Sequence, residues 1–525
     1  MIATMQDWDM VLTHVIDHGA REHGNREIVT RWSDGRITRS NYANVRHDAV
    51  RLAEALRAMG IAPGDRVGVM AMNHVHQLSA WYGIIGAGAV IHTINPRLFA
   101  DQLAFIVTHA DDRVLFYDAA FAPLVEALKP RWPSVERYVC LDNGEYEALL
   151  AGYAGNARWT PVDERDPALL CYTSGTTGDP KGVLYTHRSN MLHLLSGMQP
   201  IVFGYGPRTV ALPIVPLFHA NGWGLAWVSP AVGAKLVLST LNDPAIWCEL
   251  MEAEKVTDIG GVPTVFIALF QYLDATGRAM PPTLKRAVIG GSAPPPAMVR
   301  RLLEMGIDPA HAWGMTETSP IGTTSHHPAN WDEMDLDQRV ASKVQQGRPP
   351  FGVEIRCVDL DDPARVLPRD GTTPGALEVR GPWVVRRYFR AEADCVNPDQ
   401  WFATGDVAVI HLDGSLQLTD RTKDLIKSGG EWISSVELEN AAMGHPAVAE
   451  AAAIGVPHPK WDERPVLVVV LKPGQAASAE DLREFLRGRV ANWWLPDAVH
   501  FVDEIPHTAT GKISKLALRA MFAAQ

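Results

Sequence analysis

The first part of the chain alternates between helix-like and strand-like patterns. From Asp48 to Met59 apolar residues recur at three-to-four spacing, and Gly60 can supply the left-handed stop of a helix. The apolar run Val67–Met72 then predicts a buried strand, and the alternation returns over Leu78–Thr93 and at Arg113–Tyr117. Strands that alternate with helices favour a largely parallel sheet flanked by helices, so we expect an α/β fold.

A different pattern begins beyond about Gly371. Short strands separated by turn residues are predicted at Gly375–Gly381 and over Val407–Leu418, around the turn pair Asp413-Gly414. We expect a β-rich subdomain over about residues 345–420, in the same large domain as the parallel sheet.

The last hundred residues predict a separate α+β domain. The charged segment Asp420–Asp424 has little apolar content, and strands are predicted after it at Ala451–Val456 and Val466–Leu471. Ser478 can cap a helix that carries apolar residues as far as Val490. We therefore place a domain boundary at the charged segment, with residues 1–422 before it and residues 423–525 after it.

Composition agrees with a globular enzyme of more than one domain. The chain has 525 residues, of which 47% are hydrophobic and 21% charged, and a single core usually stops growing near ~250–300 residues. A net charge of −12 argues against a large nucleic-acid interface, because phosphate backbones require a basic face.

The cysteines and the apolar segments indicate the cellular compartment of the protein. The five cysteines are single and scattered, so they provide neither a disulfide framework nor metal-ligand spacing. The first ten residues carry Asp7 and Asp9 without a basic, apolar leader, and no segment reaches the ~18 apolar residues of a membrane span. We expect a cytoplasmic enzyme with no membrane span.

Two glycine-flanked lysines, Lys181 and Lys512, provide the candidate chemistry. Lys181 ends a run rich in glycine and hydroxyl groups, which can bring backbone N–H groups close to phosphate oxygens. Pro180 precedes Lys181 and Gly182 follows it, so the run lacks the Ser or Thr that follows Gly-Lys in a P-loop, and a P-loop kinase or GTPase is disfavoured. The alternative is a turn that only connects a strand to a helix. The run consists of Thr173, Ser174, Gly175, Thr176, Thr177, Gly178, Asp179, Pro180 and Lys181.

Two other short motifs suit a nucleotide. Trp313 to Thr318 combines an aromatic ring, a glycine, hydroxyl groups and Glu317, which suit an adenine face, phosphates and a magnesium ion, since Mg²⁺ needs only one or two carboxylates beside phosphate oxygens and water. Asp406, in Thr404-Gly405-Asp406, can accept from ribose hydroxyls. A surface loop and an ordinary turn are the respective alternatives.

A third group of residues can enclose an acid. His219 and Trp223 lie among small residues, and Val262, Gly290 and Gly291 offer close approaches to the backbone. The alternative is that Phe218 and Trp223 pack in the core and that His219 is a satisfied core histidine.

Together these motifs resemble the adenylate-forming superfamily of acyl-CoA synthetases, adenylation domains and luciferases. The resemblance covers nearly the whole chain, because Thr173–Gly182, Trp313–Thr318, Thr404–Asp406, Asp420–Asp424 and Gly511-Lys512 occur in the order of the family. A further segment, Lys427–Glu437, looks like that of medium-chain fatty-acyl-CoA ligases and 3-methylthiopropionyl-CoA ligases.

The resemblance implies a fold, a two-step reaction and roles for individual residues. A large domain of two sheets and a β-barrel-like subdomain is joined at the hinge Lys423 to a mobile C-terminal domain. ATP and an acid first give an acyl-adenylate and pyrophosphate, and CoA then takes the acyl group. The implied ATP site consists of Thr173, Ser174, Gly175, Thr176, Thr177, Gly178, Lys181, His311, Trp313, Gly314, Thr316, Asp406 and Arg421, with Mg²⁺ at Glu317 and Thr173. The implied acyl pocket consists of His219, Trp223, Val262, Gly290, Gly291, Gly314 and Met315, and the CoA tunnel of Ser428, Gly429 and Gly430. The implied catalytic residues are Lys512, Glu317 and His219.

The expected activity is an ATP-dependent ligation of a short- to medium-chain carboxylic acid to CoA. Alternatives are a 3-methylthiopropionyl-CoA ligase, an adenylation enzyme that loads a carrier protein, a binding protein without catalysis and a luciferase-type oxidation. Trp313 stands where many relatives have Tyr, and Ser514-Lys515 where Gln-Arg pairs are common. The resemblance implies a homodimer as the common assembly.

Overall fold

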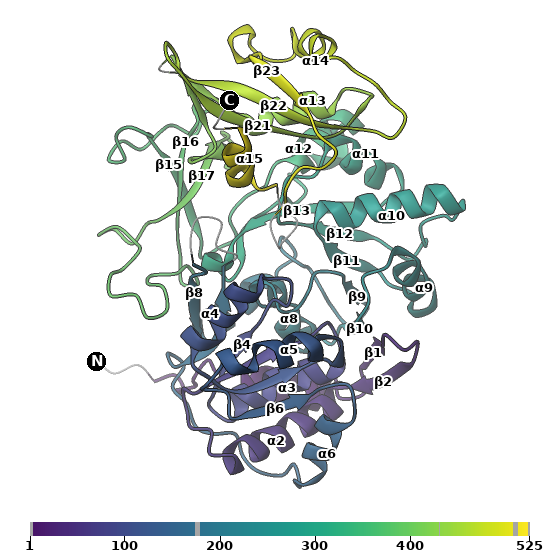
Figure 1. The fold of residues 1–525 in the computed structure, drawn as a ribbon. Helices are drawn as coiled ribbons and strands as arrows, with labels where there is room; N and C mark the ends of the chain where they lie inside the picture. The colour runs from purple at the N-terminus through teal and green to yellow at the C-terminus, as the bar shows by residue number, and fades with distance from the viewer. Residues whose placement is uncertain (1–3, 174–178, 430, 508–512, 523–525) are drawn as a thin grey trace. The chain divides into compact units, whose positions relative to one another are not determined.

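The computed structural model describes residues 4–173, 179–429, 431–507 and 513–522 (Figure 1). Contacts divide the chain into two compact units. The first contains residues up to Thr173, Pro180–Glu354 and Arg380–Gln400, and the second contains Ile355–Val379 and Trp401–Gln525. The expected class is confirmed, because two α/β sheets, a β-rich subdomain and an α+β C-terminal part are all present.

A six-stranded sheet forms from the alternating pattern near the start of the chain. Its strands pair in parallel, except that the last pair is antiparallel. The order is β6 (Arg137–Cys140), β5 (Asp112–Tyr117), β3 (Arg66–Met70), β4 (Val90–Thr93), β7 (Pro167–Tyr172) and β8 (Gly182–Thr186). The helix predicted over 48–59 is the C-terminal part of α2 (Tyr42–Ala58), and Gly60 ends it with φ of +82°.

An eight-stranded sheet makes up the rest of the first unit. Its six central strands pair in parallel, and an antiparallel strand lies at each edge. The order is β14 (Ile321–Thr324), β13 (Asp308–Gly314), β12 (Arg286–Ile289), β11 (Asp258–Gly261), β9 (Val210–Pro213), β10 (Lys235–Ser239), β1 (Glu27–Arg31) and β2 (Ile37–Asn41).

The helices of the first unit connect these strands. They are α1 (Thr13–Glu22), α2, α3 (Val75–Gly86), α4 (Ala100–Ala110), α5 (Ala122–Leu128), α6 (Glu145–Ala151), α7 (His187–Gly197), α8 (Leu225–Val232), α9 (Pro244–Glu254), α10 (Pro263–Thr276), α11 (Pro296–Glu304) and α12 (Leu336–Val344). Within the described ranges, no helix combines the length and apolar character that crossing a membrane requires.

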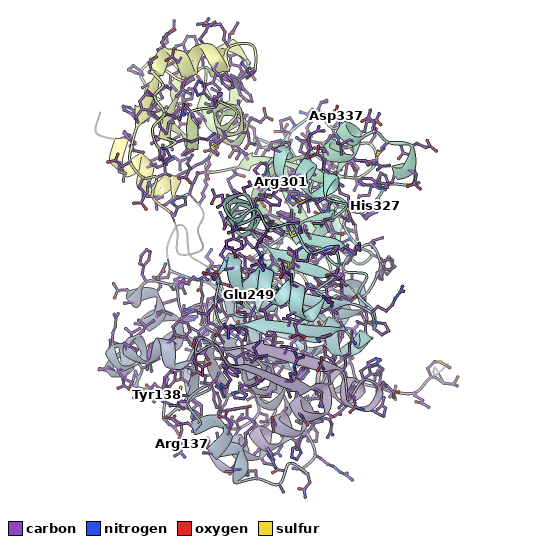
Figure 2. The ribbon with its side chains drawn as sticks, turned by 90° about the vertical axis from the view of Figure 1, so that its right-hand side faces the viewer. Arg137, Tyr138, Glu249, Arg301, His327 and Asp337 are labelled. Atoms are coloured by element: carbon purple, nitrogen blue, oxygen red, sulfur yellow. The ribbon has the colours of Figure 1, made fainter. Side chains whose placement is uncertain are left out.

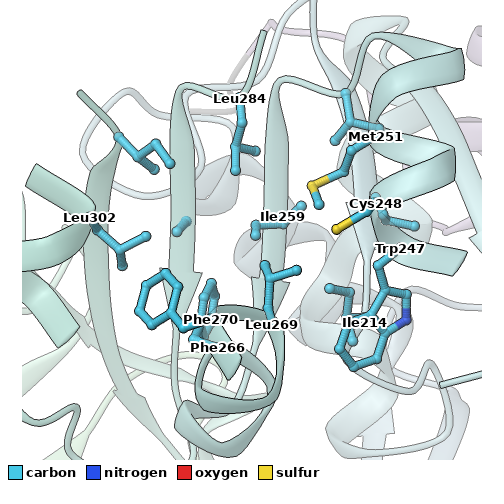
Figure 3. Close-up of a cluster of buried hydrophobic side chains, with 14 of the residues drawn as sticks. Ile214, Trp247, Cys248, Met251, Ile259, Phe266, Leu269, Phe270, Leu284 and Leu302 are labelled. Carbon is cyan, nitrogen blue, oxygen red and sulfur yellow. The ribbon is translucent and has the colours of Figure 1, made fainter. Parts of the chain in front are cut away.

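A buried cluster fixes the helices that cover part of the eight-stranded sheet. Figure 3 shows side chains of α9, α10 and α11, among them Trp247, Phe266 and Leu302, packed against strand residues such as Ile259. Each such side chain contributes about 1.5–3 kcal/mol when it is fully buried. The cluster therefore holds the sheet rigidly under the loops that leave its strands.

The second unit contains two smaller sheets. The β-rich subdomain is a four-stranded sheet in the order β15 (Glu354–Val358), β16 (Gly375–Arg380), β17 (Phe402–Ile410) and β18 (Leu416–Arg421). The C-terminal sheet comprises β20 (Glu431–Ile433), β19 (Ile426–Ser428), β22 (Asp462–Leu471) and β21 (Val448–His458), and β23 (Ala498–Phe501) pairs with β22. The helices of this unit are α13 (Ser435–Met443), α14 (Ala479–Leu486) and α15 (Lys515–Phe522).

The predicted N-terminal cap of α14 is confirmed, but the prediction that the helix extends to Val490 is wrong. The Ser478 hydroxyl accepts from Asp481 N–H at 3.1 Å, as a capping box requires. The helix ends at Leu486, because the chain is extended at Arg487 and Gly488 has φ of +80°. Val490 lies beyond the helix and packs against the buried cluster that contains Leu482 and Leu486 of α14.

Candidate active site

Four parallel strands of the eight-stranded sheet end next to predicted site residues. Side chains and backbone at the carboxyl ends of neighbouring parallel strands share one edge of a sheet, which is where ligands bind in open α/β folds. The segments that follow β9, β11, β12 and β13 contain His219 and Trp223, Val262, Gly290 and Gly291, and Met315 to Glu317, respectively. Motifs separated by about a hundred residues are therefore brought to one edge.

Trp223 lies directly against Gly290. A β-carbon added at Gly290 would be 3.0 Å from Cη2 of Trp223, so a larger residue there would press against the indole ring. Val262 contacts the neighbouring glycine, because a β-carbon at Gly291 would be 3.0 Å from Cγ1 of Val262. The structure brings these four predicted pocket residues together, and Trp223 is buried among them.

The backbone that carries Trp223 is unusual. His219, which is half-buried, is followed by five residues, Ala220 to Gly224, that all have positive φ values between +37° and +80°. No sequence pattern predicted this left-handed turn, since Ala220 and Trp223 have no preference for such φ values.

The glycine-rich run leaves β7 and returns into β8. Thr173 N–H donates to the carbonyl of Lys181 at 2.9 Å, and Lys181 N–H donates to the Thr173 hydroxyl at 3.1 Å. These two bonds close the base of the loop. The predicted phosphate-binding residues Ser174, Gly175, Thr176, Thr177 and Gly178 lie outside the described residues.

A tyrosine that the sequence analysis missed connects Lys181 and Glu317. The hydroxyl of Tyr388 donates to Oε1 of Glu317 at 2.8 Å, and Nζ of Lys181 lies 5.0 Å from the centroid of the Tyr388 ring. Burial and the Glu317 carboxylate raise the pKa of Tyr388 well above its usual range, so the hydroxyl stays a donor. Tyr388 is 71 residues from Glu317 in a segment without helix or strand, and no sequence signal marked it.

Glu317 itself is buried, with 6% of its surface exposed. It lies in a short 3-10 turn, Thr316–Thr318, whose position is fixed by the hydroxyl of Tyr185, which donates to the carbonyl of Thr316 at 2.6 Å. A buried carboxylate is costly unless it pairs with a cation or accepts a hydrogen bond, so Glu317 needs a partner of one of these kinds.

Gly314 and Trp313 are in close contact with the strand that follows them. A β-carbon at Gly314 would lie 1.7 Å from the carbonyl oxygen of Pro320, and one at Gly322 would lie 2.3 Å from the ring of Trp313. Trp313 is largely buried. Glycine is therefore required at position 314 by packing, whether or not a ligand approaches it.

His311 is buried in the strand before these residues. Its Nδ1 donates to the carbonyl of Val344 at 2.9 Å, and its backbone N–H donates to the Ser325 hydroxyl at 2.8 Å. Burial lowers the pKa of His311 to about 4, so the ring is neutral at pH 7.

The second unit brings the predicted ribose residues together. Nε of Arg421 pairs with Oδ1 of Asp406 at 2.6 Å, and the two residues face each other across β17 and β18. Asp406 is buried, whereas 44% of the Arg421 side chain is exposed. The Asp406 backbone N–H donates to the Thr404 hydroxyl at 3.1 Å, which helps to fix the turn.

The predicted hinge and CoA tunnel also belong to the second unit. Nη2 of Arg519 donates to the carbonyl of Lys423 at 3.1 Å, and Arg464 donates to the Ser428 hydroxyl at 3.1 Å. Gly429 N–H donates to the carbonyl of Trp461 at 2.8 Å. Gly430 and Lys512 lie outside the described residues, so their roles stay predictions, as do those of the other site residues.

Comparison with known proteins identifies the class that this fold and site define. The chain belongs to the AMP-binding enzyme family, whose model matches residues 16–389, and the model of the AMP-binding enzyme C-terminal domain matches residues 437–512. The resemblance stated from the motifs is thereby confirmed. ATP and CoA are substrates of the CoA ligases of this family.

Full-length relatives are CoA ligases. The chain is 44% identical to the 3-methylmercaptopropionyl-CoA ligase of Ruegeria lacuscaerulensis, with 99% of each chain covered. It is 41% identical to the medium-chain-fatty-acid–CoA ligase of Ectopseudomonas oleovorans, with 99% of this chain and 98% of that protein covered.

Solved structures share the fold over the whole chain. The anthranilate CoA ligase AuaEII in complex with anthranoyl-AMP matches with a TM-score of 0.87 at 24% identity, and both chains are completely covered. ATP-bound MatB from Rhodopseudomonas palustris matches with a TM-score of 0.84 at 25% identity, over 98% of this chain and 99% of that chain.

Two further observations do not involve the predicted site residues. Among the side chains that the structure describes, no group of three or more His, Cys, Asp or Glu could hold a metal ion. A surface groove of about 480 Å³ at the edge strand β6 is lined by Arg137 and Tyr138, labelled in Figure 2, and by none of the predicted site residues.

The neutral state of His311 predicts a pH dependence of stability. Its pKa is about 4 in the folded chain and 6.5 when exposed, so the unfolded chain binds the extra proton first as the pH falls. The contribution is complete above pH 6.5 and is lost progressively towards pH 4, by at most about 3 kcal/mol. The variant His311→Asn should therefore lose less stability than the wild type as the pH falls. The slope of its unfolding free energy against pH should be smaller by an amount that corresponds to about one proton.

Exposed His47 supplies the control for this measurement. Urea unfolding between pH 7 and 4 should give the wild-type slope for His47→Asn. A wild-type slope for His311→Asn as well would contradict the assignment of a buried, neutral imidazole.

Proposed function

We propose that the chain is an ATP-dependent acyl-CoA ligase for a short- to medium-chain aliphatic acid. The observation that carries this proposal is that Trp223, Val262 and Gly290, which we take as the wall of an apolar pocket, lie at the same sheet edge as Glu317. Full-length relatives named as CoA ligases support it independently. We expect the enzyme to act in the cytoplasm on a small-molecule acid, ATP and CoA. The homodimer that the resemblance implies stays a prediction.

The reaction follows from the poor reactivity of a carboxylate as an acyl donor. An oxygen of the carboxylate attacks the α-phosphorus of ATP, the bond to the β-phosphate oxygen breaks, and pyrophosphate leaves with the electron pair. The CoA thiolate then attacks the acyl carbon, and AMP leaves as the second product. Trp223 and Val262 would hold the acyl chain, and His219 would lie between the pocket and the entering thiol.

The residues around Glu317 fit a magnesium ion that is held mainly by phosphate oxygens and water. Glu317 supplies one buried carboxylate and Thr173 one hydroxyl, which agrees with the preference of Mg²⁺ for few protein ligands. When bound, the ion would supply charge neutralisation for the leaving pyrophosphate. Tyr388 would orient Glu317, and Lys181 would face the phosphates with the loop that begins at Thr173.

The second unit would supply the ribose contacts and the mobile cation. Asp406 can accept from ribose hydroxyls while Arg421 neutralises it, and Lys512 would stabilise the charge that builds up between carboxylate and phosphate. Rotation about Lys423 would then withdraw Lys512 and bring Ser428, Gly429 and Gly430 to the thiol. The adenine would lie near Trp313, Gly314, Thr316 and His311.

A second candidate acid is 3-methylthiopropionate. The relative from Ruegeria lacuscaerulensis, at 44% identity, is named for the CoA ester of this acid. Both acids are short and largely apolar, so an apolar pocket formed by Trp223 and Val262 would take either.

A panel of acids tests the proposed activity. We expect AMP and acyl-CoA to form from one or more straight-chain acids between acetate and dodecanoate or from 3-methylthiopropionate, because Trp223 would limit the length of the acyl chain. Coupled detection of AMP and mass analysis of the thioester give the result, with benzoate and cinnamate as aromatic comparisons. AMP without acyl-CoA for every acid would favour carrier loading, and no pyrophosphate release at all would rule out adenylation.

Replacing Lys512 should separate the two half-reactions. Lys512→Ala should slow adenylate formation by roughly 100-fold or more, the scale of one lost donor to transition-state charge. It should leave thioester formation from supplied acyl-adenylate much less affected. Exposed Lys472 in the same unit gives the control Lys472→Ala. Equal losses in both steps for Lys512→Ala would contradict the proposal that Lys512 acts only in adenylate formation.

Removing the Tyr388 hydroxyl should weaken the use of magnesium. Hydrogen bonds to charged groups contribute about 1.5–3 kcal/mol, so Tyr388→Phe should lower adenylate formation by roughly 10-fold or more at limiting Mg²⁺. Tyr138 is the matched control, because Lys129 also lies over its ring, at 4.7 Å, far from the site residues in the sequence. A magnesium titration that is the same for Tyr388→Phe, Tyr138→Phe and the wild type would exclude this role for Tyr388.

A further inference from the structure

The left-handed turn that carries Trp223 costs free energy. Three of its residues are not glycine: Ala220, Asn221 and Trp223, with φ of +37°, +43° and +57°. A left-handed conformation costs about 1–2 kcal/mol for a residue such as Ala220 or Trp223, and less for Asn221, because asparagine adopts it more readily. Strain of this kind persists only where the surroundings hold it, and it concentrates at functional positions.

The first hold on the turn comes from the six-stranded sheet. The hydroxyl of Thr93, the last residue of β4, donates to Oδ1 of Asn221 at 3.0 Å. Both side chains are buried. Nδ2 of Asn221 has no partner among the described residues, so the amide is kept in place despite a further cost in desolvation.

The second hold comes from α7. His193 is completely buried, and Cε1 of its ring would be 2.9 Å from a β-carbon at Gly224, the last residue of the turn. Its Nε2 accepts from the backbone N–H of Ile321 at 3.4 Å, which leaves the proton on Nδ1. Burial lowers the pKa of His193 to about 3, so the ring is neutral throughout the working range of pH.

His193 is fixed on its other side as well. Its ring stands edge-on to Trp383, with the centroids 5.9 Å apart, and Nε1 of Trp383 donates to the carbonyl of Ile321 at 2.9 Å. Ile321 begins β14, four residues after Glu317. The side chain therefore connects the turn to the strand that follows the predicted magnesium ligand.

We propose that Thr93, Asn221 and His193 are positioning residues that fix the Trp223 ring, the wall of the proposed acyl pocket, by holding the left-handed turn. The turn presses the ring of Trp223 against Gly290, with Cη2 3.0 Å from the position of an added β-carbon. If either hold is removed, the turn relaxes towards ordinary φ values and the ring moves off Gly290. The inference rests on the proposed function, because Trp223 is taken as the wall that the acyl chain meets.

Two variants test the two holds separately in the full-length chain. Thr93→Val removes the hydrogen bond to Asn221 at nearly constant shape, and His193→Asn removes the ring beside Gly224. For each, kcat and KM are measured for butyrate, hexanoate, octanoate and decanoate by AMP formation with CoA. We expect kcat/KM for decanoate relative to butyrate to rise by about 10-fold, mainly through KM, since one methylene in an apolar pocket discriminates by this order.

His187 provides the matched control. It is a second buried histidine on α7, and its Nδ1 accepts from Leu12 N–H at 3.2 Å. His187→Asn should leave the ratio between the acids within about twofold of the wild type. An unchanged or lower ratio in both Thr93→Val and His193→Asn, or an equal rise in His187→Asn, would overturn the inference.

A stability measurement tests the contact at Gly224 without any activity. Gly224→Ala introduces a β-carbon at φ of +80° and against the His193 ring. The fall in melting temperature caused by Gly224→Ala should be smaller in a His193→Ala background, because the ring it would meet is absent. Equal falls in both backgrounds would overturn the hold by His193, whereas failure of every acid in the panel would overturn the proposed function alone.

Discussion

The whole site depends on the parallel pairing of four neighbouring strands. Because β9, β11, β12 and β13 run in the same direction, the segments that follow them must leave at one edge of the eight-stranded sheet. The segments that carry His219, Val262, Gly290 and Glu317 become neighbours for this reason. The buried helices on the sheet keep the edge rigid, so that the site is assembled from fixed backbone and not from a single flexible loop.

Buried charges in the candidate site each have a defined partner. Glu317 accepts from Tyr388, which burial keeps protonated, and Asp406 pairs with Arg421, whose side chain is half exposed. Each arrangement orients a carboxylate that can also interact with a nucleotide or its metal ion. An unpaired carboxylate at either position would be too costly to bury.

Local patterns predicted much of the fold, but tertiary contacts decided the details of the site. The cap at Ser478, the stop at Gly60 and the alternation of strands and helices all follow from short stretches of sequence. Asp406 and Arg421 were expected to act together, and they form an ion pair. Tyr388 carries no pattern of its own, and its role depends on a contact across 71 residues.

The left-handed turn could not be predicted for a related reason. Ala220 and Trp223 have no preference for positive φ, and the conformation is selected by Thr93 and His193, which come from distant parts of the chain. Local propensity and tertiary structure disagree at this turn, and such disagreements are expected where function constrains the backbone.

The most direct test of the account is a crystal structure of the full-length chain with a non-hydrolysable acyl-sulfamoyl-adenosine. We predict that the end of the acyl chain contacts the ring of Trp223 beside Gly290, and that the sulfamoyl group lies near Thr173 and Glu317. An acyl chain that avoids the edge formed by the ends of β9, β11, β12 and β13 would contradict it.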